Sequence, residues 1–110
     1  MNRKEILSRK LESLFQDAQV RAEVCALLDT YGKEDYEKEV PRVKLAILKL
    51  AGSDLNKISR YALWAKQDYR DVLAWAEYPR QSKTWSTSDS QKKEKLIKAD
   101  REEYEKWLIT

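Results

Sequence analysis

Two carboxylates in the middle of the chain have the spacing that acid–base or metal chemistry would need. Asp68 and Asp71 are three residues apart, so on a helix they share one face. Paired carboxylates can hold Mg²⁺ or divide the roles of acid and base. A hard-cation site needs several converging oxygens, however, and only these two are spaced to meet. The sequence therefore favours a plainer interpretation, in which both residues cap or flank a helix and pair with Arg70 or Lys66.

A second acidic group lies in the segment "GKEDYEKEVP". Its carboxylates can attract a divalent ion, but the segment lacks the glycine and the final glutamate of an EF-hand loop. We expect a solvated acidic connection between two helices. The carboxylates concerned are Glu34, Asp35, Glu37 and Glu39.

Most other site chemistry is excluded by composition. The chain has no histidine, which removes Ser-His-Asp and Cys-His catalysis and every imidazole metal site. The lone Cys25 lies among apolar residues and predicts a half-buried, inert thiol. Gly32 and Gly52 cannot form a glycine-rich nucleotide loop. We expect no catalytic residue, no metal and no cofactor, and a metal-dependent carboxylate enzyme is the least favoured alternative.

Aromatic and basic side chains are interleaved between residues 60 and 85. Trp, Tyr and Arg dominate protein interfaces, and rings beside cations also suit single-stranded nucleic acid. In the alternative interpretation, Trp64, Trp75 and Tyr78 pack between helices and the cations lie at the edge of the core. The candidate partner-binding residues are Arg60, Trp64, Arg70, Trp75, Tyr78, Arg80, Lys83 and Trp85.

The charge pattern favours a protein partner over nucleic acid. The sequence pI of about 8.9 lies just below the range typical of nucleic-acid-binding domains, and acidic residues interrupt the basic segment. We therefore predict a non-catalytic protein that acts by protein–protein interaction, with a partner that is either another protein or a second copy. Weak binding of single-stranded nucleic acid through residues 60–85 is the alternative.

Self-association has its own sequence signals. Ala62, Ala65 and Ala76 give the long helix a small-residue face, which permits close packing against either a neighbouring helix or a second copy. The C-terminal helix has a thin apolar stripe, and its Trp107 and Leu108 can dock across a dimer. These signals are compatible with a homodimer as well as with packing inside one chain.

Length and composition predict an all-α fold. A chain of 110 residues fits one domain spanning 1–110, and only two glycines and two prolines are present, too few for the turns of a β protein. We expect a compact bundle of about five helices. Their ranges are 3–16, with Asn2 and Glu5 as a capping box; a second helix capped by Asp17 and ended by Gly32; a central apolar helix 42–51; a long helix 54–78; and a charged C-terminal helix 89–109.

Two features of this plan have alternatives. Apolar residues recur at alternating intervals of three and four from Leu55 to Ala76, which favours one continuous helix over a break at Gln67 with Asp68 as the next cap. Residues 79–89 are expected to form a loop. Within it, Trp85 is either a plug that packs against the core or an exposed anchor for a partner.

No segment predicts export or membrane insertion. The N-terminus lacks the apolar stretch of a secretory signal, and no apolar run approaches the length needed to span a bilayer. We expect a soluble, cytoplasmic protein without a membrane partner.

Overall fold

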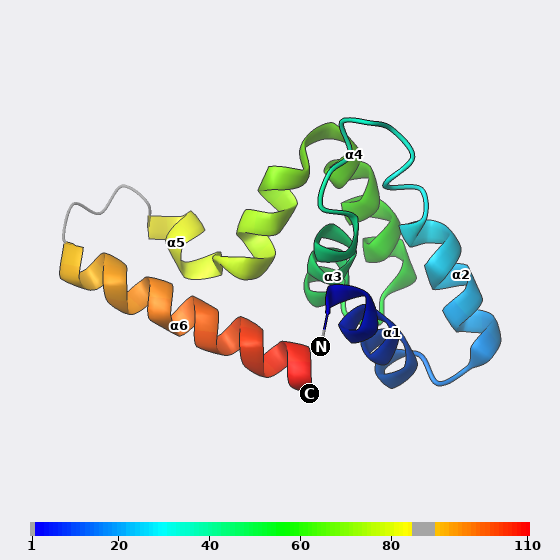
Figure 1. The fold of residues 1–110 in the computed structure, drawn as a ribbon, viewed down its shortest axis with the longest axis horizontal. Coiled ribbons are helices and arrows are strands. Elements are labelled where there is room, and N and C mark those ends of the chain that lie inside the picture. Colours follow the sequence, from blue (N-terminus) through cyan, green and yellow to red (C-terminus); the bar gives the residue numbers. More distant parts are fainter. Residues whose placement is uncertain (1, 85–89) are drawn as a thin grey trace.

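The computed structural model of the chain describes the backbone of residues 2–84 and 90–110 and the side chains of 2–81 and 91–110. Within these ranges the secondary structure is helical and contains no strand, which confirms the all-α prediction (Figure 1). Six helices are described, one more than the sequence indicates. They are α1 (Arg3–Leu14), α2 (Ala18–Leu28), α3 (Val40–Ala51), α4 (Leu55–Glu77), α5 (Pro79–Thr84) and α6 (Ser90–Ile109).

Three helices begin at side-chain caps, and the sequence predicts two of these caps, Asn2 and Asp17. The Asn2 Oδ1 atom accepts a hydrogen bond from the Glu5 N–H at 2.9 Å. Asp17 accepts from the Gln19 N–H at 2.8 Å, and Asp54 accepts from the Asn56 N–H at 2.9 Å. Each cap satisfies an N–H group that has no partner inside its own helix.

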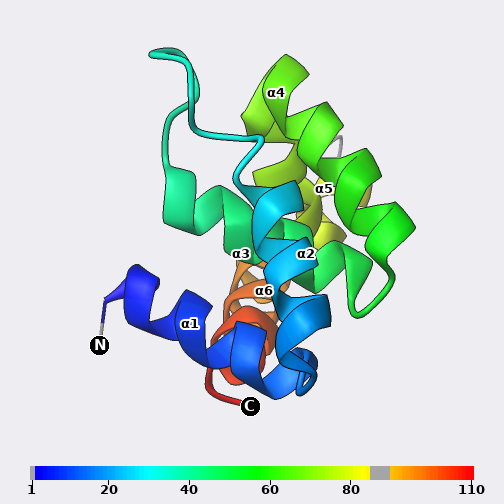
Figure 2. The ribbon, with the colours of Figure 1, turned by 90° about the vertical axis from the view of Figure 1, so that its right-hand side faces the viewer.

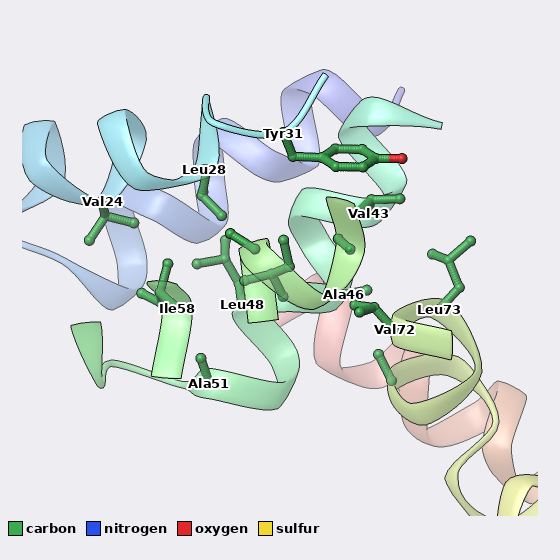
Figure 3. Packing of buried hydrophobic residues seen from close by; sticks show 14 of the residues in the cluster. Val24, Leu28, Tyr31, Val43, Ala46, Leu48, Ala51, Ile58, Val72 and Leu73 are labelled. Atoms are coloured by element: carbon green, nitrogen blue, oxygen red, sulfur yellow. The ribbon is translucent and has the colours of Figure 1, made fainter. Parts of the chain in front are cut away.

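Helix α3 is the centre of the fold, as its apolar sequence predicts. Val43, Ala46, Ile47 and Leu48 are buried completely in the core (Figure 3), and the helix packs against α4 and α1. Gly52 ends the helix with φ of +62°, a conformation that glycine adopts without strain. Burial on nearly all sides explains why α3 lacks the polar face of a surface helix.

Helix α4 packs along α3 through its small-residue face. Ala62, Ala65 and Ala76 are all buried in the common core, beside Ile58 and Val72. The small side chains let the two helices approach closely. The alanine face that suggested a dimer is therefore occupied within the same chain.

The expectation of one continuous helix from 54 to 78 is wrong at Asp68. This residue has extended backbone angles, φ −156° and ψ 99°, and divides α4 into two helical segments that meet at a bend. The Asp68 carboxylate accepts a hydrogen bond from the Arg70 N–H at 3.0 Å and so caps the second segment. The broken-helix alternative, with Asp68 as the cap, is the one the structure adopts.

The expectation of a loop over 79–89 is wrong for residues 79–84, which form α5. Pro79 suits the first position of a helix, where no N–H donor is needed. The N–H groups of Arg80 and Gln81 donate to the carboxylate of Asp100, which lies in α6 and is buried. Because this cap comes from a residue far along the chain, the local sequence around Pro79 does not reveal it.

Helix α6 returns along the molecule to α1, as two perpendicular views show (Figures 1 and 2). The ammonium group of Lys10 in α1 lies over the Trp107 ring, 4.2 Å from its centroid, and Trp107 also stacks on Tyr104. The tryptophan that suggested docking across a dimer thus packs inside one chain. With α5, α6 extends the molecule to 48 Å along its longest axis.

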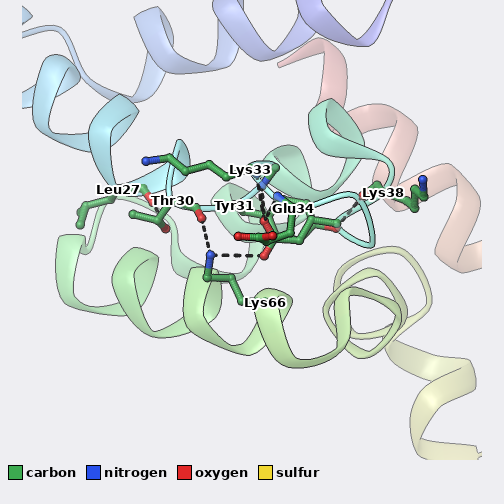
Figure 4. Close-up of polar contacts among 9 residues, drawn as sticks. Leu27, Thr30, Tyr31, Lys33, Glu34, Lys38 and Lys66 are labelled. Atoms are coloured by element: carbon green, nitrogen blue, oxygen red, sulfur yellow. Dashed lines mark hydrogen bonds and ion pairs between the residues drawn. The ribbon is translucent and has the colours of Figure 1, made fainter.

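The acidic connection between α2 and α3 is not fully solvated, which corrects the prediction for Glu37. Its side chain is buried, and one carboxylate oxygen accepts from the N–H groups of Gly32, Lys33 and Glu34 at 2.9 to 3.3 Å (Figure 4). The other oxygen lies 3.3 Å from the Lys66 ammonium of α4. Glu37 therefore organises this connection and ties it to α4.

Candidate interaction surface

The exposed side of α4 carries large apolar side chains. Trp64 is 44% exposed and Trp75 is 36% exposed, and the two rings meet edge to face with centroids 5.7 Å apart. Leu63, beside Trp64, is 61% exposed. These rings belong to different segments of α4, one before the bend and one after it. In the alternative interpretation of the sequence, Trp64 and Trp75 pack between helices. Their exposed fractions show instead that both rings face solvent.

The bend at Asp68 positions this pair. The carboxylate of Asp68 binds the Arg70 guanidinium through two hydrogen bonds of 3.0 and 3.2 Å, and these hold the pKa of Asp68 below its usual value. The carboxylate therefore stays ionised near neutral pH, which strengthens its capping bond to the Arg70 N–H. This cap fixes where the second helical segment begins, and Trp75 belongs to that segment.

Further exposed polar and aromatic residues lie one helical turn from each tryptophan. Arg60 and Gln67 lie one helical turn on either side of Trp64, and both are exposed. Tyr78, which is 40% exposed, follows one turn after Trp75. An apolar centre with a polar rim is the usual anatomy of a protein interface. We call the group of Arg60, Leu63, Trp64, Trp75 and Tyr78 the tryptophan face.

Two of the predicted binding cations already have carboxylate partners. Arg70 is paired with Asp68, as described above. Arg80 forms an ion pair with Asp100 at 3.0 Å and a second with Glu103, so it joins α5 to α6. Their charges are therefore compensated within the chain.

The side chains of two further candidates, Lys83 and Trp85, are not described by the structure. Trp85 belongs to the undescribed residues 85–89, so both interpretations of it, plug and anchor, stay predictions. Lys83 is within α5, but its side chain is not described.

Leu63 is a member of the tryptophan face that the sequence analysis did not select. The signal was present, since Leu63 falls outside the apolar stripe that runs through Ile58, Ala62 and Ala65. A large apolar residue off the buried stripe of a helix is expected to face solvent.

The described carboxylate side chains do not gather into a metal-binding group. No group of three or more Cys, Asp or Glu side chains within 2–81 and 91–110 is placed to hold a metal ion. The Asp68 carboxylate is engaged by Arg70, which is the plainer of the two interpretations given to this residue above.

The described helices also include none with the length and apolar character required to cross a bilayer. Fold and surface together define an all-α protein with an exposed aromatic face. Comparison of the chain with protein-family models, curated proteins and solved structures gives no match.

Proposed function

We propose that this chain is a non-catalytic, cytoplasmic interaction protein that binds a protein partner through the tryptophan face. The observation that carries the proposal is the edge-to-face contact of Trp64 and Trp75 on the solvent side of α4. Two partly exposed indoles in contact present apolar area that folding of this chain leaves uncovered. Tryptophan, tyrosine and arginine are also the residues that contribute most to interface affinity.

The ion pairs of this region support a protein partner over nucleic acid. Binding of single strands relies on cations that are available to phosphates as well as on stacking rings. Arg70 and Arg80 are each paired with carboxylates, and Asp71 lies one helical turn from Trp75. The partner we expect therefore presents an apolar side chain to the indole pair and polar groups to the rim.

Photo-crosslinking from Leu63, a member of the tryptophan face, tests this proposal. A variant with p-benzoylphenylalanine in place of Leu63 is irradiated in an extract of its source cells, and its adducts are resolved by mass. We expect one discrete adduct that disappears when Trp64→Ala and Trp75→Ala are added. An adduct at twice the chain mass would identify the partner as a second copy.

The matched control carries the same photoreactive residue in place of Tyr36, which is 65% exposed but belongs to the connection between α2 and α3. It should give no such adduct. An adduct that survives loss of both tryptophans would contradict the proposal. Separate titration with a labelled single-stranded oligonucleotide at two salt concentrations tests the alternative, since tight binding that weakens steeply with salt would favour nucleic acid.

A further inference from the structure

A cleft is lined by residues from the first turn of α1, the beginning of α3, the end of α4, and α6. Its volume is about 260 Å³. Small-molecule sites commonly have roughly 300–1,000 Å³, so this cleft lies just below that range and suits a small ligand. It includes none of the tryptophans, and it shares only Tyr78 with the tryptophan face.

The inner wall of the cleft is apolar. Leu45 of α3 is buried, and Ile97 and Leu108 of α6 are half-buried. Tyr104 stands between them on α6. Burial, followed by the nearby Glu77 carboxylate, raises the pKa of Tyr104, so its hydroxyl stays protonated and can donate a hydrogen bond.

The polar part of the cleft has more positive than negative charge. Arg42 and Glu77 form a bidentate pair with bonds of 2.8 and 2.6 Å, so these two charges compensate each other. Arg3 and Arg101 also line the cleft, and neither forms an ion pair with any residue that the structure describes. Glu105 is the one further carboxylate in the lining, which leaves three arginines against two glutamates.

We propose that this cleft binds a small amphipathic anion, in which one carboxylate, phosphate or sulfonate group is joined to an apolar body. Arg3 and Arg101 supply the charge for the anionic group. Guanidinium groups bind such oxyanions through two parallel hydrogen bonds. The apolar wall of Leu45, Ile97 and Leu108 accepts the body of the ligand. The residues assigned to the ligand, Arg3, Arg101, Leu45, Ile97 and Leu108, do not belong to the tryptophan face.

The test uses the fluorescent sulfonate 8-anilino-1-naphthalenesulfonate as the probe. We expect saturable binding of the probe at one site. The affinity should fall at least about tenfold in the double variant Arg3→Ala and Arg101→Ala, because each substitution removes a charge-assisted hydrogen bond to the sulfonate. Both arginines are exposed, so the variant should fold, as circular dichroism will verify. The matched control Arg9→Ala removes an exposed arginine of α1 that does not line the cleft and should leave binding unchanged.

Two further measurements locate the probe. N-phenyl-1-naphthylamine, which lacks the sulfonate, should bind the wild type more weakly and with no response to the arginine substitutions. In ¹⁵N NMR spectra, the anionic probe should shift amide signals of α6 near Tyr104 and of the first turn of α1, while the indole N–H signals of Trp64 and Trp75 stay in place. Unchanged affinity in the arginine variant, absence of saturation, or shifts centred on Trp64 and Trp75 would each overturn the proposal.

Discussion

The buried face of α4 carries three alanines, Ala62, Ala65 and Ala76, whereas its exposed face carries two tryptophans, Trp64 and Trp75. The largest apolar side chains of α4 are thus on its exposed side, although Ile58 and Val72 share the buried side with the alanines. The alanines have a reason in the fold, since they allow close packing on α3. The tryptophans have no comparable reason in the fold. The contrast separates what α4 does for folding from what it offers to a partner.

The largest expected effect is on the buried face. Ile58→Ala removes a completely buried side chain from the contact between α4 and α3. We expect the free energy of unfolding to fall by about 2–5 kcal/mol, through lost burial and the cavity that remains. Urea denaturation followed by circular dichroism measures this. Leu63→Ala, a truncation on the exposed face of the same helix, should change stability by less than about 0.5 kcal/mol.

The connection that Glu37 organises gives the next largest effect. Burial by itself raises the pKa of Glu37, but the N–H groups of Gly32 and Glu34, the Lys66 ammonium and the Lys33 N–H outweigh it and hold the pKa below its ordinary value. We expect Glu37→Gln to cost about 1–2 kcal/mol at neutral pH, because hydrogen bonds to a charged acceptor become neutral ones.

The pH dependence of this loss has a defined sign. Since the folded-state pKa of Glu37 lies below the unfolded value, the stabilisation is complete above about pH 4.3 and disappears as pH falls through the folded-state pKa. Unfolding curves of the wild type and Glu37→Gln should therefore converge in acid. The exposed Glu34→Gln should show a much smaller difference at neutral pH. A gap for Glu37→Gln that is constant with pH would contradict this account.

A smaller effect is expected at the bend that joins the two faces. Asp68→Ala removes the cap of the second helical segment and the pair with Arg70. We expect a fall of about a few degrees in melting temperature and a weaker exciton signal from the Trp64–Trp75 pair in circular dichroism. Asp68→Asn keeps a capping oxygen and should retain most of the signal. An unchanged signal in Asp68→Ala would show that the cap does not position the pair.

The smallest effect on stability belongs to the tryptophans themselves. Trp64→Ala loses one edge-to-face contact and part of an exposed side chain, so we expect a cost of about 1 kcal/mol or less. Calorimetry of Trp64→Ala beside Ile58→Ala measures the difference directly. A cost for Trp64→Ala as large as that for Ile58→Ala would remove the distinction between the two faces.

The sequence predicts most of this fold because its signals are local. Three helices are capped by residues that accept from N–H groups two or three positions later, namely Asn2, Asp17 and Asp54. Gly52 is the residue at which α3 ends. At Asp68 the signals conflict, since the apolar stripe favours continuity and the aspartate favours a new cap. The structure satisfies both by bending the helix and keeping Val72 and Ala76 on the core.

Other features depend on partners that are distant in sequence. Helix α5 is capped by Asp100 of α6, and Glu37 is held in part by Lys66 of α4, so neither is visible in a local window. Among the candidate site residues, the positions of Trp64 and Trp75 within α4 are predictable. The contact between the two indoles depends on tertiary packing, and so does the ion pair of Arg80 with Asp100 of α6.

Hydroxyl-radical footprinting tests the central claim most directly, because it reports the solvent exposure of each indole with and without a partner. In the purified protein, Trp64 and Trp75 should be oxidised readily, as should Tyr36 in the connection between α2 and α3. In an extract of its source cells, we predict that Trp64 and Trp75 become protected while Tyr36 does not. Equal oxidation of the two tryptophans in both preparations would contradict a partner-binding role for the tryptophan face.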